Sequence, residues 1–123
     1  MVITVGHNNI ICKTSESFES SINEQMKAMT SELWVSEHGG NDEYPCFGIL
    51  IDEDKASLTF FDEDGSCFVS VGNGSSSETI SFCNGQYEVT GSHIINKSKA
   101  MAILMDFFNN RCLSDSVKWE QLY

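Results

Sequence analysis

The sequence has little positive charge, a single proline and no long apolar run. Only seven Lys and Arg residues stand against 18 Asp and Glu, and the net charge is −11. A protein that follows a nucleic-acid backbone needs Lys and Arg to displace counterions from phosphate, and an anionic membrane surface attracts the same residues. The charge balance therefore predicts no nucleic-acid binding and no membrane attachment. The single proline and the 41% hydrophobic content argue against disorder.

The apolar runs are too short to cross a membrane. Runs such as 46–51 extend for five or six residues, whereas a spanning helix needs about 18 or more. The first residues, 1–9, lack the basic segment and the long apolar segment of a signal peptide. The five cysteines contain no C-x-x-C motif, so no zinc ribbon or redox motif is present. We therefore expect a cytoplasmic protein whose reduced thiols mostly pack in the core.

The length predicts one domain. A folded chain of 13.7 kDa should expose roughly 6,600 Å², against about 20,000 Å² when unfolded. Burial on that scale supports a core without disulfides or metal. The expectation is a single domain that spans residues 1–123.

Hydrophobic periodicity predicts two helices and a series of strands. Phe18, Ile22, Met26 and Met29 share one face of a helix of about four turns. A closing helix over about 97–109 has its apolar stripe at Ala100, Ile103, Leu104, Phe107 and Phe108. Period-two alternation predicts strands at 2–5, 33–35, 46–51, 56–61, 67–71, 80–82, 87–89 and 117–123.

Turn signals connect these strands into a meander. Asp64-Gly65 and Asn84-Gly85 suit the positive φ angles of tight hairpins, and 52–55 forms the preceding turn. The order of elements predicts an α+β fold. Its mainly antiparallel β-meander sheet should have about five to seven strands, with an N-terminal and a C-terminal helix packed on it.

Two acidic triplets are the most prominent candidates for a site. Asp52-Glu53-Asp54 and Asp62-Glu63-Asp64 occupy successive turns, so they should lie at opposite ends of the strand between them, roughly 17–20 Å apart. That distance excludes one shared metal ion, and the EF-hand pattern also fails. The triplets are either solvated turns or the rim of a protein-binding surface.

No catalytic motif emerges from the sequence. His7, His38 and His93 belong to no H-E-x-x-H or H-x-E motif, and Pro45-Cys46 is not continued as P-C-x-x-C. A pairing of Cys46 with His93 is conceivable, but nothing in the sequence places them together. We predict no catalytic residue, no cofactor and no metal ligand. Trp119, with Trp34, Tyr44, Tyr87 and Tyr123, could instead supply binding anchors or pack on the sheet.

A set of short segments occurs in a defined order from residue 33 to residue 122. The segments are Leu33-Trp34-Val35, Pro45-x-Phe47-x-Ile49, Ala56 to Phe61, Asp62 to Gly65, Phe68 to Gly72, Glu78 to Phe82, Ala100-x-x-x-Leu104-x-x-Phe107-Phe108 and Val117-x-Trp119-x-x-Leu122. This ordered set resembles the immunity proteins of bacterial polymorphic toxin systems, in particular the group often paired with deaminase toxins.

The resemblance implies a non-enzymatic antitoxin of the bacterial cytoplasm. Such a protein binds one cognate toxin domain and blocks its active site, as in contact-dependent inhibition between competing bacteria. Acidity fits this role, because a toxin that acts on nucleic acid is commonly basic around its substrate groove. A small enzyme with a Cys/His or carboxylate site and a generic interaction subunit remain as alternatives. The expected partner-binding residues are Asp42, Glu43, Asp52, Glu53, Asp54, Asp62, Glu63, Asp64 and Trp119.

Overall fold

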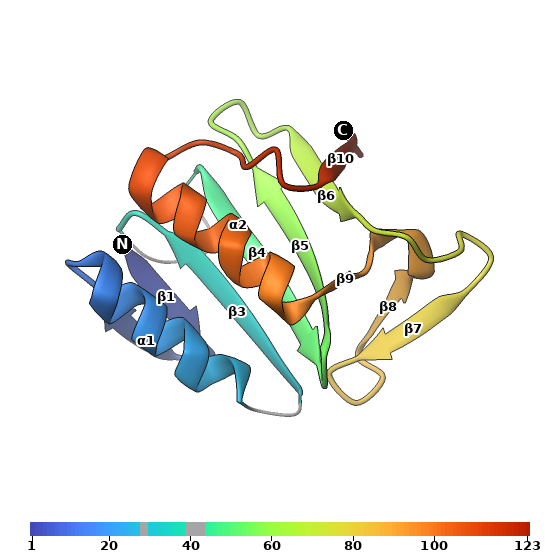
Figure 1. The fold of residues 1–123 in the computed structure, drawn as a ribbon, viewed down its shortest axis with the longest axis horizontal. Helices are drawn as coiled ribbons and strands as arrows, with labels where there is room; N and C mark the ends of the chain where they lie inside the picture. Colours follow the sequence, from blue (N-terminus) through green and yellow to red (C-terminus); the bar gives the residue numbers. More distant parts are fainter. Residues whose placement is uncertain (28–29, 39–43) are drawn as a thin grey trace.

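A computed structural model describes residues 1–27, 30–38 and 44–123 of the chain. Two helices cover one face of an antiparallel sheet, which confirms the predicted α+β class (Figure 1). The described elements are, in chain order, β1 (Val2–Val5), β2 (Asn8–Ile11), α1 (Ser15–Met26), β3 (Thr30–Ser36), β4 (Cys46–Asp52), β5 (Lys55–Phe61), β6 (Cys67–Val71), β7 (Thr79–Phe82), β8 (Tyr87–Thr90), the 3-10 turn η1 (Gly91–His93), β9 (Ile95–Asn96), α2 (Lys97–Asn110) and β10 (Lys118–Gln121).

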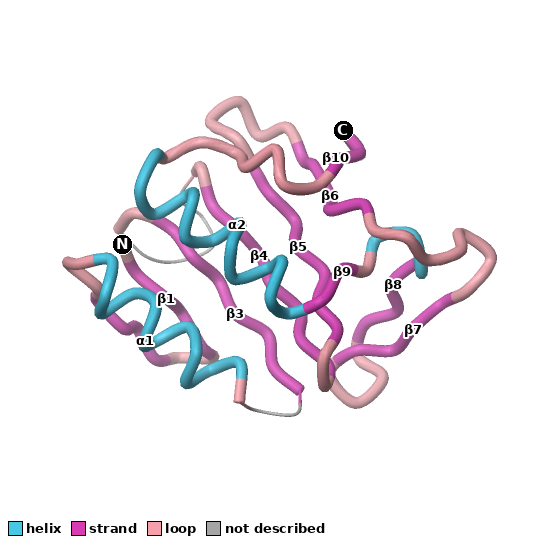
Figure 2. The backbone as a smooth tube through the Cα atoms, in the orientation of Figure 1, coloured by secondary structure: helices cyan, strands magenta, loops and turns pink. Residues whose placement is uncertain are grey.

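The main sheet has the strand order β10-β6-β5-β4-β3-β1-β2, and all neighbouring strands are antiparallel. The strands β5, β4, β3 and β1 lie side by side in Figure 2. β9 joins it as an eighth strand beside β5. The predicted strands are present, and two short ones add to them. β2 is an edge strand with the polar residues Asn8 and Asn9, so its sequence has no alternating pattern. β9 has only two residues and pairs with a distant part of the chain.

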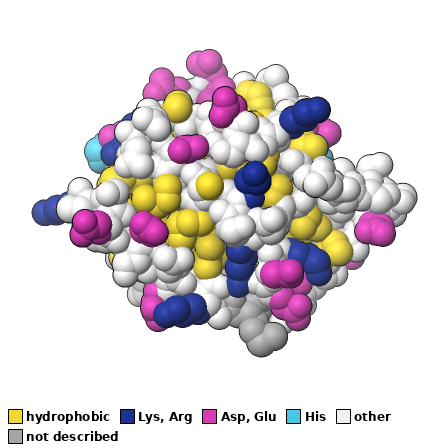
Figure 3. Space-filling view, in the orientation of Figure 1, with side chains coloured by type: hydrophobic (Ala, Val, Ile, Leu, Met, Phe, Trp, Pro, Cys, Tyr) yellow, Lys and Arg dark blue, Asp and Glu magenta, His cyan; other side chains and the backbone are white. Residues whose placement is uncertain are grey.

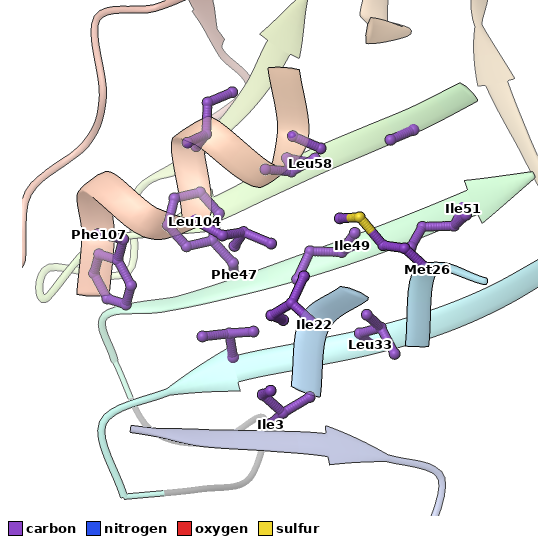
Figure 4. Packing of buried hydrophobic residues seen from close by; sticks show 14 of the residues in the cluster. Ile3, Ile22, Met26, Leu33, Phe47, Ile49, Ile51, Leu58, Leu104 and Phe107 are labelled. Atoms are coloured by element: carbon purple, nitrogen blue, oxygen red, sulfur yellow. The ribbon is translucent and has the colours of Figure 1, made fainter. Parts of the chain in front are cut away.

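The central strands bury one complete face. Ile49 on β4 pairs with Leu33 on β3 and with Leu58 on β5, and all three side chains are fully buried. Because side chains alternate along a strand, Phe47 and Ile51 point the same way as Ile49. This face and the two helices form one apolar cluster (Figure 4). The folded chain exposes 6707 Å², close to the value expected from its mass.

α1 begins at a reciprocal cap. The Thr14 hydroxyl accepts a hydrogen bond from the Ser17 amide at 3.1 Å, and the Thr14 amide donates to the Ser17 hydroxyl at 3.3 Å. Phe18, Ile22 and Met26 are buried against the sheet, as the periodicity predicts. Met29, the fourth residue of the predicted stripe, lies outside the described residues.

α2 lies beside α1 over the same face of the sheet. Asn96 caps it by accepting from the Lys99 amide at 2.8 Å, and Ala100, Ile103, Leu104 and Phe107 are buried as predicted. Phe108 is half-buried and stacks on Phe18 of α1 with ring centroids 4.9 Å apart. Apolar side chains therefore gather between the two helices on the outer surface (Figure 3). Neither helix is long and apolar enough to span a membrane, as far as the chain is described.

The sheet forks where β6 leaves β5. β6 pairs with β5 only along Thr59–Phe61, and β9 takes its place beside Lys55 and Ala56. Two buried serines join the branches, since the hydroxyls of Ser57 and Ser70 both donate to the His93 carbonyl, at 2.9 and 3.1 Å. These polar contacts replace the missing strand-to-strand hydrogen bonds at the fork.

The second hairpin does not continue the meander. Asn84 and Gly85 have φ angles of 58° and 88°, so the turn predicted from Asn-Gly is present. However, β7 and β8 form a separate two-stranded sheet. β10 explains this departure, because it pairs with β6 along Phe68–Val71 and occupies the edge of β6 on which β7 would have continued the meander.

Candidate interaction surface

The two acidic turns lie at opposite ends of β5, as the sequence predicts. Asp52 pairs with Lys55 across the β4–β5 turn. Phe61 pairs with Cys67 across the β5–β6 turn, which contains the second triplet. The structure therefore separates the two triplets, and each has its own surroundings.

The β5–β6 turn is closed by its first carboxylate. One oxygen of Asp62, Oδ1, accepts hydrogen bonds from the backbone amides of Asp64 and Ser66, each at 2.9 Å. The Asp62 amide in turn donates to the Ser66 carbonyl at 3.0 Å. Asp62 therefore holds the turn in shape, while Glu63 and Asp64 are exposed at its tip.

The β4–β5 turn lies beside the N-terminal end of α2. The Asp54 carbonyl accepts a hydrogen bond from the Lys97 amide at 3.0 Å. Asp54, Lys55 and Lys99 line one pocket. Lysines therefore accompany the acidic side chains of this turn and offset part of their charge.

An aromatic cluster lies on the face of the sheet opposite the helices. Trp34 alternates with the buried Leu33 and Val35, so its indole points away from the core. Its ring lies over Gly48, where an added Cβ would be 3.1 Å from the indole. The Phe61 ring lies between Trp34 and Tyr44, with centroid distances of 6.1 and 5.9 Å. We call Trp34, Tyr44, Phe61 and Tyr123 the aromatic patch.

Tyr123 joins the patch through the pairing of the C-terminal residues with β6. The Cys67 amide donates to the Tyr123 carbonyl at 2.8 Å, and the Leu122 amide donates to the Cys67 carbonyl at 2.7 Å. Burial raises the pKa of the Cys67 thiol, and a hydrogen bond with the Tyr123 side chain partly opposes that rise. Tyr123 has a raised pKa in turn, chiefly because a Cys67 thiolate would repel its phenolate.

The patch is accessible and is bordered by negative charge. Tyr44 and Tyr123 are 46% and 69% exposed, the highest fractions among the exposed aromatic side chains. The acidic turn directly follows Phe61 in the chain. The neighbouring strand ends, 44–46, 66–68 and 121–123, contain no Lys or Arg. Exposed aromatic rings beside exposed carboxylates can bind a basic protein surface, through cation–π contacts and ion pairs.

The other end of this face is covered. The hydroxyl of Tyr87 on β8 donates to a Glu32 carboxylate oxygen on β3 at 2.8 Å. This hydrogen bond is the main reason that the pKa of Tyr87 is raised. Phe82 of β7 is fully buried, and β7 contacts β4. The β7–β8 hairpin therefore covers the part of this face near Glu32, while Tyr44 and Tyr123 stay exposed at the end near the β5–β6 turn.

The remaining predicted partner-binding residues have different positions. Trp119 packs inward, with its ring 6.2 Å from Phe47, and its indole N–H donates to the Ser114 carbonyl at 2.7 Å. This is the packing interpretation of Trp119, so we do not include it in the patch. Asp42 and Glu43 lie outside the described residues.

The structure also places the candidate chemical groups. Cys12, Cys46 and Cys67 are buried, Cys83 is half-buried and Cys112 is exposed. His93 Nε2 lies 3.3 Å from a carboxylate oxygen of Glu120. Across the described ranges, no group of three or more His, Cys, Asp or Glu residues could hold a metal ion.

The sequence alone did not identify the patch as a unit. Trp34, Tyr44 and Tyr123 were candidate anchors, but Phe61 was expected only as part of a strand. The sequence placed Trp34 and Phe61 in strands without showing which face each of them occupies. Their proximity depends on the register of β3, β4 and β5, which aligns Trp34 with Gly48 and Cys46 with Phe61.

No protein-family model matches the chain. No curated protein matches it with significance.

Proposed function

We propose that this chain is an immunity protein of a bacterial polymorphic toxin system. It binds one cognate toxin domain in the cytoplasm and blocks the active site, without an enzymatic activity of its own. The toxin is basic around its substrate groove and acts on nucleic acid, as a deaminase does. The observation that carries the proposal is the exposed aromatic patch beside the acidic turn at 62–64.

The composition of this surface supports protein binding. Aromatic residues are enriched where interfaces concentrate their affinity, and Tyr and Trp lose little side-chain entropy on binding. Phe61 holds the rings of Trp34 and Tyr44 on either side of it, so the anchors are ordered before the partner arrives. Preorganised anchors reduce the entropic cost of association.

The charge of the turn supports a basic partner. Glu63 and Asp64 are exposed at the tip, and Asp62 fixes the turn through its two amide contacts. Negative charge next to the anchors raises the association rate with a basic surface. A substrate groove that binds phosphates would accept the same carboxylates, so binding would exclude the substrate.

Co-expression with the toxin tests the proposal. The toxin domain encoded by the neighbouring gene is produced with and without this chain. The expected result is that growth is restored and that the two proteins co-purify as a complex. If the chain neither restores growth nor forms a complex, the proposed function is wrong.

A matched pair of variants tests the surface. Tyr44→Ala removes an exposed anchor of the patch, and Ile11→Ala removes an exposed apolar side chain on the distant edge strand β2. Tyr44→Ala should weaken toxin binding at least about tenfold, because a central anchor contributes about 2 kcal/mol or more. Ile11→Ala should leave the affinity within about twofold. Equal effects of the two variants would contradict binding through the patch.

The same experiments separate the alternatives. An interaction subunit of another assembly would co-purify with a protein that is not a toxin, without restoring growth. A small enzyme would lose activity on replacement of a chemical group such as His93, while Tyr44→Ala left that activity intact. Either result would replace the antitoxin proposal.

A further inference from the structure

A pocket of about 750 Å³ lies on the opposite end of the molecule from the aromatic patch. It is formed where the sheet forks, between the start of α2, the end of β6, the start of β10 and β7. Its volume is within the range of small-molecule sites. Its apolar lining comes from Val71, Ile80, Ile94, Ile95 and Val117.

The walls of the pocket are held by backbone contacts. The Gly72 amide donates to the Ser92 carbonyl at 2.8 Å, and the Gly91 amide donates to the Glu78 carbonyl at 2.8 Å. The strands approach so closely that a Cβ on Gly72 would lie 1.8 Å from the Ile94 carbonyl oxygen. Ser57 and Ser70 tie η1 to β5 and β6 directly beneath. The pocket therefore exists before any ligand binds.

Positive charge concentrates at this pocket. Lys55, Lys99 and Lys118 line it, three of only seven basic residues in a chain of net charge −11. In the described ranges, none of these three ammonium groups forms an ion pair or a hydrogen bond. Lys97, in contrast, turns away and donates to the Met26 carbonyl. Figure 3 shows Lys and Arg side chains next to apolar ones beside the start of α2.

The rim also contains acceptors. Asp54 and Glu78 line the pocket, so its five charged side chains sum to +1. A simple anion would meet both attraction and repulsion here. A molecule with a phosphate at one end and hydrogen-bond donors at the other would satisfy both sets, with its flat body on the apolar wall.

We propose that this pocket binds a small phosphorylated molecule with a flat body and amino donors, of the nucleoside monophosphate class. Lys99 and Lys118 bind the phosphate, and the apolar wall of Val71, Ile95 and Val117 receives the flat ring. Asp54 and Glu78 accept from the amino groups. The inference is independent of the proposed antitoxin function, because the pocket and the patch lie at opposite ends of the sheet.

Titration with adenosine 5′-monophosphate tests the proposal. The full chain is followed by amide NMR at low ionic strength, where Gly72, Gly74 and Gly91 report on the pocket walls. We expect saturable shifts of these amides with a Kd of about 1 mM or tighter. Adenosine and inorganic phosphate, which each carry half of the recognised chemistry, should each bind at least about tenfold more weakly. If adenosine bound as tightly as adenosine 5′-monophosphate, Lys99 and Lys118 would not bind the phosphate and the proposal would be wrong.

A pair of double variants with the same net charge provides the control. Lys99→Gln with Lys118→Gln should weaken the nucleotide at least about tenfold. Lys13→Gln with Lys27→Gln removes two exposed charges outside the pocket and should change binding less than about twofold. All four side chains are exposed, so both variants should fold. An absence of saturable shifts at 5 mM nucleotide, or equal losses in both variants, would overturn the proposal.

Discussion

The two acidic turns have the same sequence, Asp-Glu-Asp, but different surroundings. The turn at 52–54 lies beside the first turn of α2 and shares a pocket with Lys55 and Lys99. The turn at 62–64 lies next to exposed tyrosines, and no basic residue occurs in the strand ends around it. The net charge around an acidic turn therefore depends on which side chains lie near it in the folded chain. Of these two turns, the second has the negative charge that fewer described basic side chains offset.

Charge reversal at each turn provides the strongest test of this contrast. Glu63→Lys with Asp64→Lys should lower the association rate with the toxin at least about 30-fold, because steering would become repulsion. Glu53→Lys with Asp54→Lys makes the same change at the other turn and should lower the rate less than about threefold. Stopped-flow kinetics at two salt concentrations measures both. Comparable losses would show that net charge, rather than the position of the charge, controls binding.

Replacing one aspartate of each turn by alanine should show which carboxylate contributes to the free energy of unfolding. Asp62→Ala leaves two backbone amides without their acceptor and should cost about 1–2 kcal/mol of unfolding free energy. Asp54→Ala removes a side chain that is exposed, and should stay within about 0.5 kcal/mol. Urea denaturation of both variants gives the comparison. A larger loss for Asp54→Ala would mean that the first turn depends on its side chain after all.

The turns also differ in which residue takes the left-handed conformation. The β5–β6 turn uses Gly65 at φ 82°, whereas the β4–β5 turn uses Glu53 at φ 53°. Gly65→Ala should therefore destabilise the chain by about 1 kcal/mol, and Glu53→Gly should stabilise it by a few tenths to about 1 kcal/mol. Thermal unfolding of the two variants would show shifts of opposite sign. Shifts of the same sign would contradict this account of the turns.

A last expected effect, comparable in size, concerns the hairpin that covers part of the helix-free face. Tyr87→Phe removes the hydrogen bond to Glu32 and should cost about 1 kcal/mol at neutral pH. The folded pKa of Tyr87 is raised, so this contribution is complete below the unfolded pKa of about 10 and is lost as pH rises through the folded pKa. Unfolding free energies of both proteins between pH 8 and 11 should converge at the alkaline end. A constant difference would show that Tyr87 does not act through its proton.

The sequence predicts elements well where one periodicity dominates. The helix stripe from Ala100 to Phe107 and the alternation of 46–51 both follow from local spacing, and both are confirmed. The fork could not be predicted, because it depends on β9 pairing with residues about forty positions earlier. Trp119 illustrates the same limit at a single position. Its inward orientation follows from the pairing of β10 with β6, which the residue type does not reveal.

The candidate surface was predictable in kind but not in position. An acidic turn and aromatic anchors were both expected from the sequence. Locally the two triplets differ only in the residue that follows them, Lys55 or Gly65, and the sequence does not show that Lys99 approaches the first triplet from α2. The tyrosines likewise assemble from the loop before β4 and from the last residue of the described chain. The residue types of the surface could therefore be predicted from the sequence, but their proximity depends on long-range packing.

The strand order has a consequence for how the protein folds. β3, β4, β5 and β6 are neighbours both along the chain and in the sheet, so this part can form through short-range hairpin closure. β10 must instead close a loop of some fifty residues before it reaches β6. We therefore expect Tyr123 to be added at a late step, so that the aromatic patch is incomplete until that step has occurred. Toxin binding would then report a fully folded chain, whereas hydrogen exchange in β4 and β5 would report the earlier hairpins.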